Sequence, residues 1–238
     1  FVNRSESIHI PELKIERTED GVAYSWWGLD AEEEFVLEDS FNGHESDLSL
    51  VANGEQVEFL RGTGYHDLML VFNTDQDVKY HLAQSDILGA EIELITPPHK
   101  KYDHNGSLNL VDGILGTERW KGDQWLGFNK RKVEMIIDLD SAQNIDRFSI
   151  GFLNQNGSWI YLPESMKISV SDNRKDWTEV QNVSIKGSAI VNRQEFTLDA
   201  KANHVKVEIF PMEKIPEGKV GAGYTPWTFV DEIQIFSE

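Results

Sequence analysis

The stretch LVDGILGTERWKGDQWLGF, residues 110–128, places an Asp-Gly turn, a threonine and two tryptophans in a short loop-like run. The segment KVEMIIDLD at 132–140 follows at once and alternates apolar and polar residues, as a strand with one buried face does. Near the C-terminus, WTFVDEIQIF at 227–236 reads as a last strand that carries Glu232. A long loop set between strands therefore favours an all-β fold for this part of the chain.

Strand-like segments fill the interval between these two ends. They are DRFSIGFL, SMKISVSDN, WTEVQNV, RQEFTLDA and HVKVEIF, within residues 146–210. Together with the two strands above and one near residue 108, they predict an eight-stranded antiparallel jelly roll. Hardly any segment shows the apolar period of an amphipathic helix.

These segments resemble the F5/8 type C, or discoidin-like, domain, in the branch used as family 32 carbohydrate-binding modules. The loop at 110–128, the run SVSDNRKDWTEV at 169–180 and the last strand carry the resemblance, which covers about residues 100–238 and places a domain at 98–238. The run from ELITPPHKKY onward is similar to modules at the C-terminal end of Bacteroidetes-type glycoside hydrolases such as β-hexosaminidases. The resemblance implies a galactose-binding-domain-like jelly roll that binds sugar.

The composition narrows the possible partners. The chain of 238 residues is long enough for two domains, and 39% hydrophobic with 26% charged residues is typical of a globular protein. Residues 1–97 carry 5 Lys and Arg against 21 Asp and Glu, and so hold −16 of the total charge of −19. Such an acidic surface repels phosphate backbones and anionic membranes. We therefore expect neither nucleic acid nor a phospholipid membrane as a partner, and no membrane insertion. The absence of cysteine excludes disulfides and thiolate metal sites.

The charge step beside Pro97-Pro98 predicts a domain boundary, with residues 1–97 forming an acidic domain of unknown role. Seven short strand-like segments recur there, separated by Gly, Asn and Asp, which favours a β-sandwich. They lie at 12–16, 21–29, 33–39, 46–52, 55–61, 66–73 and 78–83. The chain begins in the middle of a strand-like run, so we interpret it as part of a longer polypeptide.

The resemblance also implies one structural calcium ion between the first loop and the last strand. Asp112 and Thr117 would supply loop oxygens, and Glu232 would close the site from the end of the sequence. Ca²⁺ binds six to eight hard oxygen ligands, which carboxylates and loop carbonyls provide. The alternative is that Asp112 caps its turn and Glu232 lies on a solvated face.

Sugar binding requires an aromatic ring that stacks on a pyranose face and polar side chains that fix the hydroxyl groups. Three loops offer these residue types at one end of the predicted sandwich. The candidates are Trp125 in the first loop, Asn154, Gln155, Trp159 and Tyr161 in the second, and Tyr224 and Trp227 in the third. The second loop lacks the Arg and His that many sugar-binding relatives place there, so amides would replace them. The alternative is that these aromatic residues form part of the core.

The sequence contains no motif of a catalytic or nucleotide-binding site, neither G-x-S-x-G nor H-E-x-x-H nor a P-loop. We therefore expect no catalytic residues and no enzyme activity. The predicted function is that of a non-catalytic carbohydrate-binding accessory region, which targets an attached or associated glycoside hydrolase to glycans. We expect a bacterial, extracytoplasmic location. The alternative is a purely structural spacer of a larger β-N-acetylhexosaminidase-like hydrolase.

Overall fold

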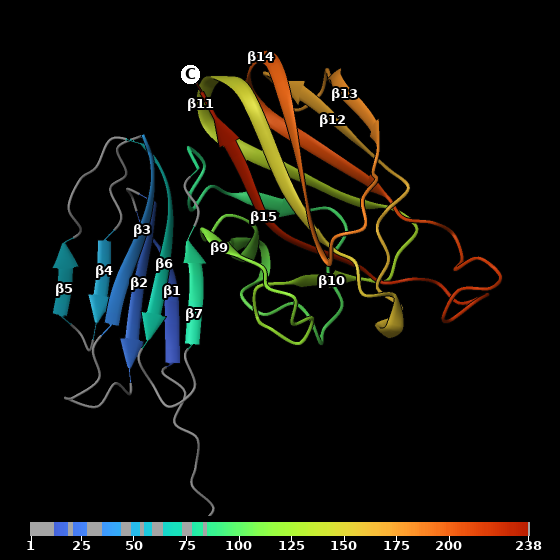
Figure 1. Cartoon of the computed structure of the whole chain (residues 1–238). Coiled ribbons are helices and arrows are strands. Elements are labelled where there is room, and N and C mark those ends of the chain that lie inside the picture. The colour runs from blue at the N-terminus through green and yellow to red at the C-terminus, as the bar shows by residue number, and fades with distance from the viewer. Residues whose placement is uncertain are drawn as a thin grey trace, which may run out of the picture. The chain divides into compact units, whose positions relative to one another are not determined.

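The computed structural model describes residues 85–237 and, before them, the backbone of seven strands (Figure 1). The chain divides into two compact units, Phe1–Ala83 and Gln84–Glu238. The division therefore lies before the boundary near residue 97 that the charge step predicted. The physical reason is strand β8 (Ile92–Leu94), which pairs antiparallel with a strand of the second unit and so belongs to it.

The first unit consists of strands in its described part, and each of the seven predicted strand segments overlaps one of them. They are β1 (Glu12–Thr18), β2 (Gly21–Trp27), β3 (Phe35–Gly43), β4 (Ser49–Ala52), β5 (Glu55–Glu58), β6 (Gly64–Phe72) and β7 (Val78–Leu82). One set pairs in the order β1-β2-β4-β5, and β6 pairs with both β3 and β7. The turns lie outside the described residues, and the packing of these strands as a sandwich stays a prediction.

The second unit contains eight strands in its described part, but they are not the eight predicted segments, because four of those segments form two long strands and the predicted strand near residue 108 is a 3₁₀ helix. Besides β8 they are β9 (Ile114–Leu115), β10 (Leu126–Phe128), β11 (Val133–Leu153), β12 (Ser165–Ser171), β13 (Thr178–Ser184), β14 (Val191–Phe210) and β15 (Thr228–Phe236). Two 3₁₀ helices, η1 (Gly106–Leu110) and η2 (Asn156–Ser158), lie in the connecting loops. Residues 85–237 are thus all-β, apart from these single turns of helix.

Strands β11 and β14 build both layers of the sandwich, because each one bends and serves the two layers in turn (Figure 1). The first half of β11 pairs with β8 and with the second half of β14, which continues to β12 and β13. The second half of β11 pairs with the first half of β14 and with β15, which continues to β10. The register shifts between Asp138 and Gln143, beside Asp140 with φ +59°, mark the bend in β11.

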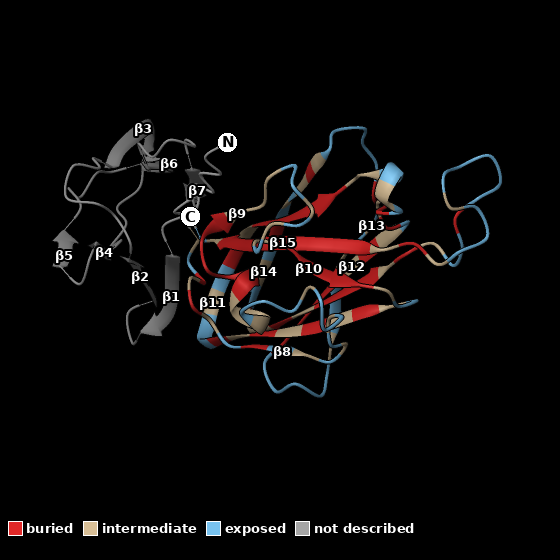
Figure 2. Ribbon diagram, turned by 90° about the horizontal axis from the view of Figure 1, so that it is seen from below, coloured by how far each residue is buried: buried red, intermediate tan, exposed pale blue. Residues whose placement is uncertain are grey.

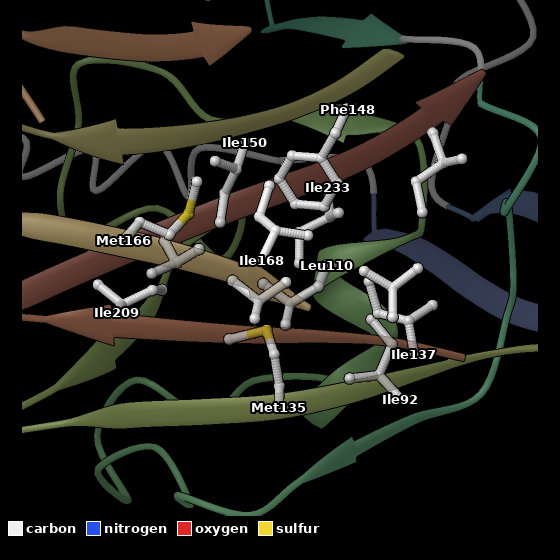
Figure 3. Packing of buried hydrophobic residues seen from close by; sticks show 14 of the residues in the cluster. Ile92, Leu110, Met135, Ile137, Phe148, Ile150, Met166, Ile168, Ile209 and Ile233 are labelled. Carbon is white, nitrogen blue, oxygen red and sulfur yellow. The ribbon is translucent and has the colours of Figure 1, made fainter. Parts of the chain in front are cut away.

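The core lies between these two layers. Alternate residues of the first layer point into it, including Met135, Ile137 and Ile168, and they meet Phe148 and Ile233 from the second layer (Figure 3). Strand β15 differs because its first eight residues are all buried, which Figure 2 shows as a nearly continuous red strand. The first loop contacts this strand, since the Gly113 and Gly116 N–H groups donate to Glu232 and Asp231. The site is therefore built around β15.

Candidate functional site

A β-bulge in β15 places two neighbouring acidic residues in the interior. Val230 pairs with Phe152 and Ile233 pairs with Ile150, so two residues of β15 oppose a single residue of β11. Asp231 and Glu232 occupy these two positions, and both are fully buried. The sequence analysis named only Glu232. Two adjacent acidic residues in a largely apolar strand could have drawn attention to Asp231. In a regular strand neighbouring side chains point to opposite faces, so an acidic residue at each position is unusual for a buried strand.

Asp231 is held by an arginine that the sequence analysis missed. The guanidinium of Arg193, on β14, donates to both carboxylate oxygens of Asp231 at 2.9 and 2.8 Å. The Gly116 N–H in the first loop donates to the same carboxylate at 2.7 Å. Burial raises the pKa of Asp231, and the adjacent Arg193 opposes that rise. This ion pair joins the loop, β14 and β15 at one point.

Asp112 and Glu232 form a second buried acidic contact beside this ion pair. The two side chains lie close enough for each to affect the ionisation of the other. The Gly113 N–H donates to Glu232 Oε1 at 3.0 Å, and the Ile114 N–H donates to Asp112 Oδ1 at 2.8 Å. Burial raises the pKa of each carboxyl well above the usual value for that residue type. The negative charge of Asp112 raises the pKa of Glu232 further. The pair therefore retains a proton or shares a cation.

The predicted calcium ligands are only partly brought together. Asp112 and Glu232 meet in the interior, so the alternative of a solvated Glu232 is wrong, while Asp112 also caps its turn. Thr117 has other partners, because its hydroxyl accepts from the Arg119 N–H at 3.3 Å and its carbonyl from Trp125 Nε1 at 2.9 Å. Within the described part of the chain, no group of three or more His, Cys, Asp or Glu residues could hold a metal ion. Two carboxylates beside a loop offer hard oxygens of the kind Ca²⁺ prefers.

Two of the predicted sugar-binding residues form an exposed aromatic pair. The rings of Trp159 and Tyr224 stack with centroids 4.8 Å apart and planes 21° from parallel. Tyr224 is 61% exposed and Trp159 is 37% exposed. The Trp227 N–H donates to the Trp159 carbonyl at 2.8 Å, which fastens the loop of the first ring to the loop of the second. The pair is thus a fixed aromatic surface open to solvent.

Two other predicted sugar contacts are wrong because the structure buries them. Trp125 has no exposed surface, and its ring packs against Gly116 while its indole N–H is bonded to the loop. Tyr161 is 6% exposed and donates its hydroxyl to the Val220 carbonyl at 2.8 Å. The alternative weighed at the outset, that large aromatic residues serve the core, holds for these two positions.

The remaining predicted residues border the exposed pair. Gln155 donates its side-chain amide to the Glu118 carbonyl, so this amide ties two loops together. Asn154 is half-buried, and its backbone N–H donates to the Ile190 carbonyl at 2.7 Å. Trp227 is half-buried as well, and Ile160 forms an isolated parallel bridge with it. In Figure 1 the loop with η2 lies at the same end of the second unit as β10.

Comparison with known proteins assigns the class of this unit. Residues 109–207 match the family model of the F5/8 type C domains described as the NedA-like, galactose-binding domain. This part of the chain therefore matches the discoidin-like F5/8 type C domains, as the sequence motifs predicted. A comparison with curated proteins found no match.

Several solved structures are similar to the chain at low identity. A family 32 carbohydrate-binding module produced by Clostridium perfringens is 13% identical, covers 65% of this chain and all of its own, and has a TM-score of 0.43. A fucose-binding module of Streptococcus pneumoniae is 13% identical over 65% of this chain and 98% of its own, with a TM-score of 0.43. A chitosan-binding module from a Paenibacillus chitosanase/glucanase is 17% identical over 65% and 99%, with a TM-score of 0.42.

Within residues 85–237 and the seven earlier strands, there is no helix with the length and apolar character to cross a membrane.

Proposed function

We propose that the second unit binds a glycan without catalysis, and that the stacked pair of Trp159 and Tyr224 is its contact surface. The observation that carries the proposal is the exposure of Tyr224 in a loop that backbone hydrogen bonds hold in place. An exposed aromatic ring presents a face on which a pyranose can stack, and a ring already fixed loses little entropy on binding. The description of the matched family as galactose-binding supports the same class of ligand.

Neighbouring groups supply the polar contacts that such a site requires. Asn156 and Gly157 are exposed beside Trp159, and Ser158 is half-buried there. Their amide, backbone and hydroxyl groups can donate to and accept from sugar hydroxyls. A single shallow surface of this kind binds with a dissociation constant between about 1 mM and 1 µM, equivalent to about −4 to −8 kcal/mol.

The proposed role is to hold an attached or associated glycoside hydrolase against its glycan substrate outside the cytoplasm. A tethered module raises the effective concentration of the enzyme at the substrate, so weak affinity is sufficient. The part of the chain described here would then be an accessory region and not an enzyme. The proposal includes one structural Ca²⁺ held by Asp112 and Glu232, which would pin the first loop to β15.

A purely structural spacer is the second candidate, and the burial of Trp125 and Tyr161 favours it. In that case the loops would serve the packing of the domain, and Tyr224 would have no ligand. A direct measurement of glycan binding distinguishes the two candidates, because only the first of them predicts binding.

The test is a glycan array probed with the whole chain in calcium and again in EDTA. Tyr224→Ala removes the exposed ring, and Ile95→Ala is the control because Ile95 is 46% exposed outside these loops. Glycan binding that Tyr224→Ala abolishes and Ile95→Ala leaves intact supports the proposal. A folded chain that binds no glycan in calcium overturns it in favour of the spacer. Loss of binding in EDTA would support the calcium ion.

A further inference from the structure

A second aromatic group continues from Trp227 away from the stacked pair. Tyr102 lies at its centre, with ring centroids 5.2 Å from Trp227 and 6.1 Å from Trp120. His99 completes the group at 5.1 Å from Trp227. Most of these contacts are edge-to-face, which fixes the rings relative to one another. We call the group of His99, Tyr102, Trp120 and Trp227 the aromatic strip.

The aromatic strip is accessible and adjoins the proposed sugar site. Tyr102, Trp120 and Trp227 are half-buried, and His99 is exposed. Trp227 belongs to the strip and also donates its backbone N–H to the carbonyl of Trp159. The strip and the stacked pair therefore lie on neighbouring loops, and Tyr102, Trp120 and Trp227 also pack with their inner sides against a buried cluster that includes Trp125 and Phe229.

Basic residues flank members of the aromatic strip in the sequence, since Lys100 and Lys101 lie between His99 and Tyr102, and Arg119 and Lys121 lie on either side of Trp120. Lys100, Lys101, Arg119 and Lys121 are all exposed, and Lys121 Nζ lies 5.1 Å from the centre of the Trp120 ring. Among the described residues none of these four forms an ion pair with an acidic side chain. By contrast, Lys167 on the sheet is paired with Glu208 at 2.6 Å.

The charge of this surface is unusual for the chain. The full sequence carries −19, whereas residues 98–121 hold four Lys and Arg against three Asp and Glu, one of which is the buried Asp112. Residues 1–97 hold −16 of that charge, so residues 98–238 are close to balance at −3. The exposed side chains of residues 98–121 therefore carry four positive charges against the two negative charges of Asp103 and Glu118, which gives this aromatic stretch a positive balance.

We propose that the aromatic strip binds an anionic sugar unit, next to the unit that stacks at Tyr224, so that the ligand is an acidic oligosaccharide. The rings would contact the sugar face, while Arg119 and Lys121 would pair with its carboxylate or sulfate group. A hexuronate and a sulfate ester present the same chemistry to these cations. The inference rests on the proposed glycan binding and specifies its ligand class.

The test is titration calorimetry of the whole chain with three probes: an oligogalacturonate, a sulfated galacto-oligosaccharide and an uncharged galacto-oligosaccharide of equal length. The expected result is tighter binding of at least one acidic probe, weakened by added salt because exposed charge pairs are screened. The double variant Arg119→Gln with Lys121→Gln is expected to weaken the acidic probe about five- to tenfold and to leave the uncharged probe unchanged. The two acidic probes distinguish carboxylate from sulfate.

The matched control is Lys175→Gln with Lys186→Gln, which removes two exposed positive charges outside the strip. This variant should bind all probes as the unchanged chain does. Equal affinity for charged and uncharged probes, or equal weakening by the control pair, overturns the acidic preference while glycan binding stands. Failure of all three probes to bind the folded chain overturns the preference as well. The glycan array with Tyr224→Ala then decides whether the proposed function fails with it.

Discussion

Asp112 in the first loop and Glu232 in the last strand are both buried in the interior of the second unit, close enough that each carboxyl affects the ionisation of the other. Two adjacent carboxylates cannot both stay ionised there without a counter-charge, because burial penalises each charge and their repulsion adds to the penalty. Either a proton or a cation therefore accompanies the pair. The two cases give different responses to substitution and to pH.

Glu232→Gln separates a shared proton from a calcium ion. In EDTA the amide has nearly the shape of a protonated carboxyl, so for a pair that shares a proton we expect the free energy of unfolding to change by less than about 1 kcal/mol. Calcium at 100 times its dissociation constant is expected to stabilise the unchanged chain by about 2.7 kcal/mol and the variant far less. Urea unfolding followed by tryptophan fluorescence measures both. Equal calcium stabilisation of the two proteins would contradict a site at Glu232.

The pH dependence of stability follows from the raised pKa of the same two carboxyls. Unfolded Asp and Glu have pKa values of about 3.9 and 4.3, and burial raises both in the folded state. Above about pH 4 the folded state therefore binds more protons than the unfolded state. In EDTA the contribution of the pair to stability is expected to fall as pH rises through the folded-state pKa.

The check is to compare unfolding free energies of the unchanged chain and of Asp112→Asn with Glu232→Gln across that pH range. The difference between the two proteins removes the contribution of all other titrating groups. In EDTA we expect the unchanged chain to lose stability relative to the variant as pH rises. Calcium should reduce this loss. A constant difference would mean that the pair does not titrate in folding.

Arg193→Met is expected to cost about 3–5 kcal/mol, because it leaves the fully buried Asp231 without its partner. Arg131→Met is the control, since Arg131 pairs with Glu213 at 3.0 Å on the surface, where both side chains are largely exposed. That pair is expected to contribute less than about 1 kcal/mol. Urea unfolding of both variants at one pH gives the comparison, and equal losses would refute the role of Arg193.

The strands were predictable because alternation along a strand is a local property. The structure nevertheless joins MIIDLD to DRFSIGFL in β11, since the chain bends near Asp140 and keeps its pairing with β14. The residues between these two segments do not show by themselves whether the chain turns back or continues as one bent strand. The long strands are therefore readable from the sequence, whereas the bend and the short strands β8, β9 and β10, which the sequence analysis missed, depend on pairing with distant residues. The strand predicted near residue 108 is wrong, because η1 lies there.

The site was less predictable, because its contacts link distant segments. Asp112 and Glu232 were found through a family resemblance, but Arg193 and Asp231 meet across 38 positions and carry no local pattern. Trp125 lies in a glycine-rich loop that reads as exposed, yet its ring packs against Gly116 in the interior. An aromatic residue in a loop therefore does not reveal by itself whether it contacts ligand or core.

Gly221→Ala tests whether the position of the Trp159 ring matters for binding. A Cβ atom at residue 221 would lie 2.8 Å from two atoms of the Trp159 indole, so the ring must move away from its place beside Tyr224. The residue also has φ +82°, which costs a residue with a side chain about 1–2 kcal/mol. Strain and displacement of the ring therefore act together in this one variant.

Gly218→Ala separates the two effects. Residue 218 lies in the same loop with φ +81°, and a Cβ atom there would meet nothing within 4 Å. Both variants should lose a similar amount of stability, whereas only Gly221→Ala should weaken glycan binding, by about tenfold if the stacked pair supplies about 1.4 kcal/mol. Calorimetry with a glycan that the array identifies measures the difference. Equal affinities of the two variants would mean that the Trp159 ring does not carry the site, because the loop strain is the same in both.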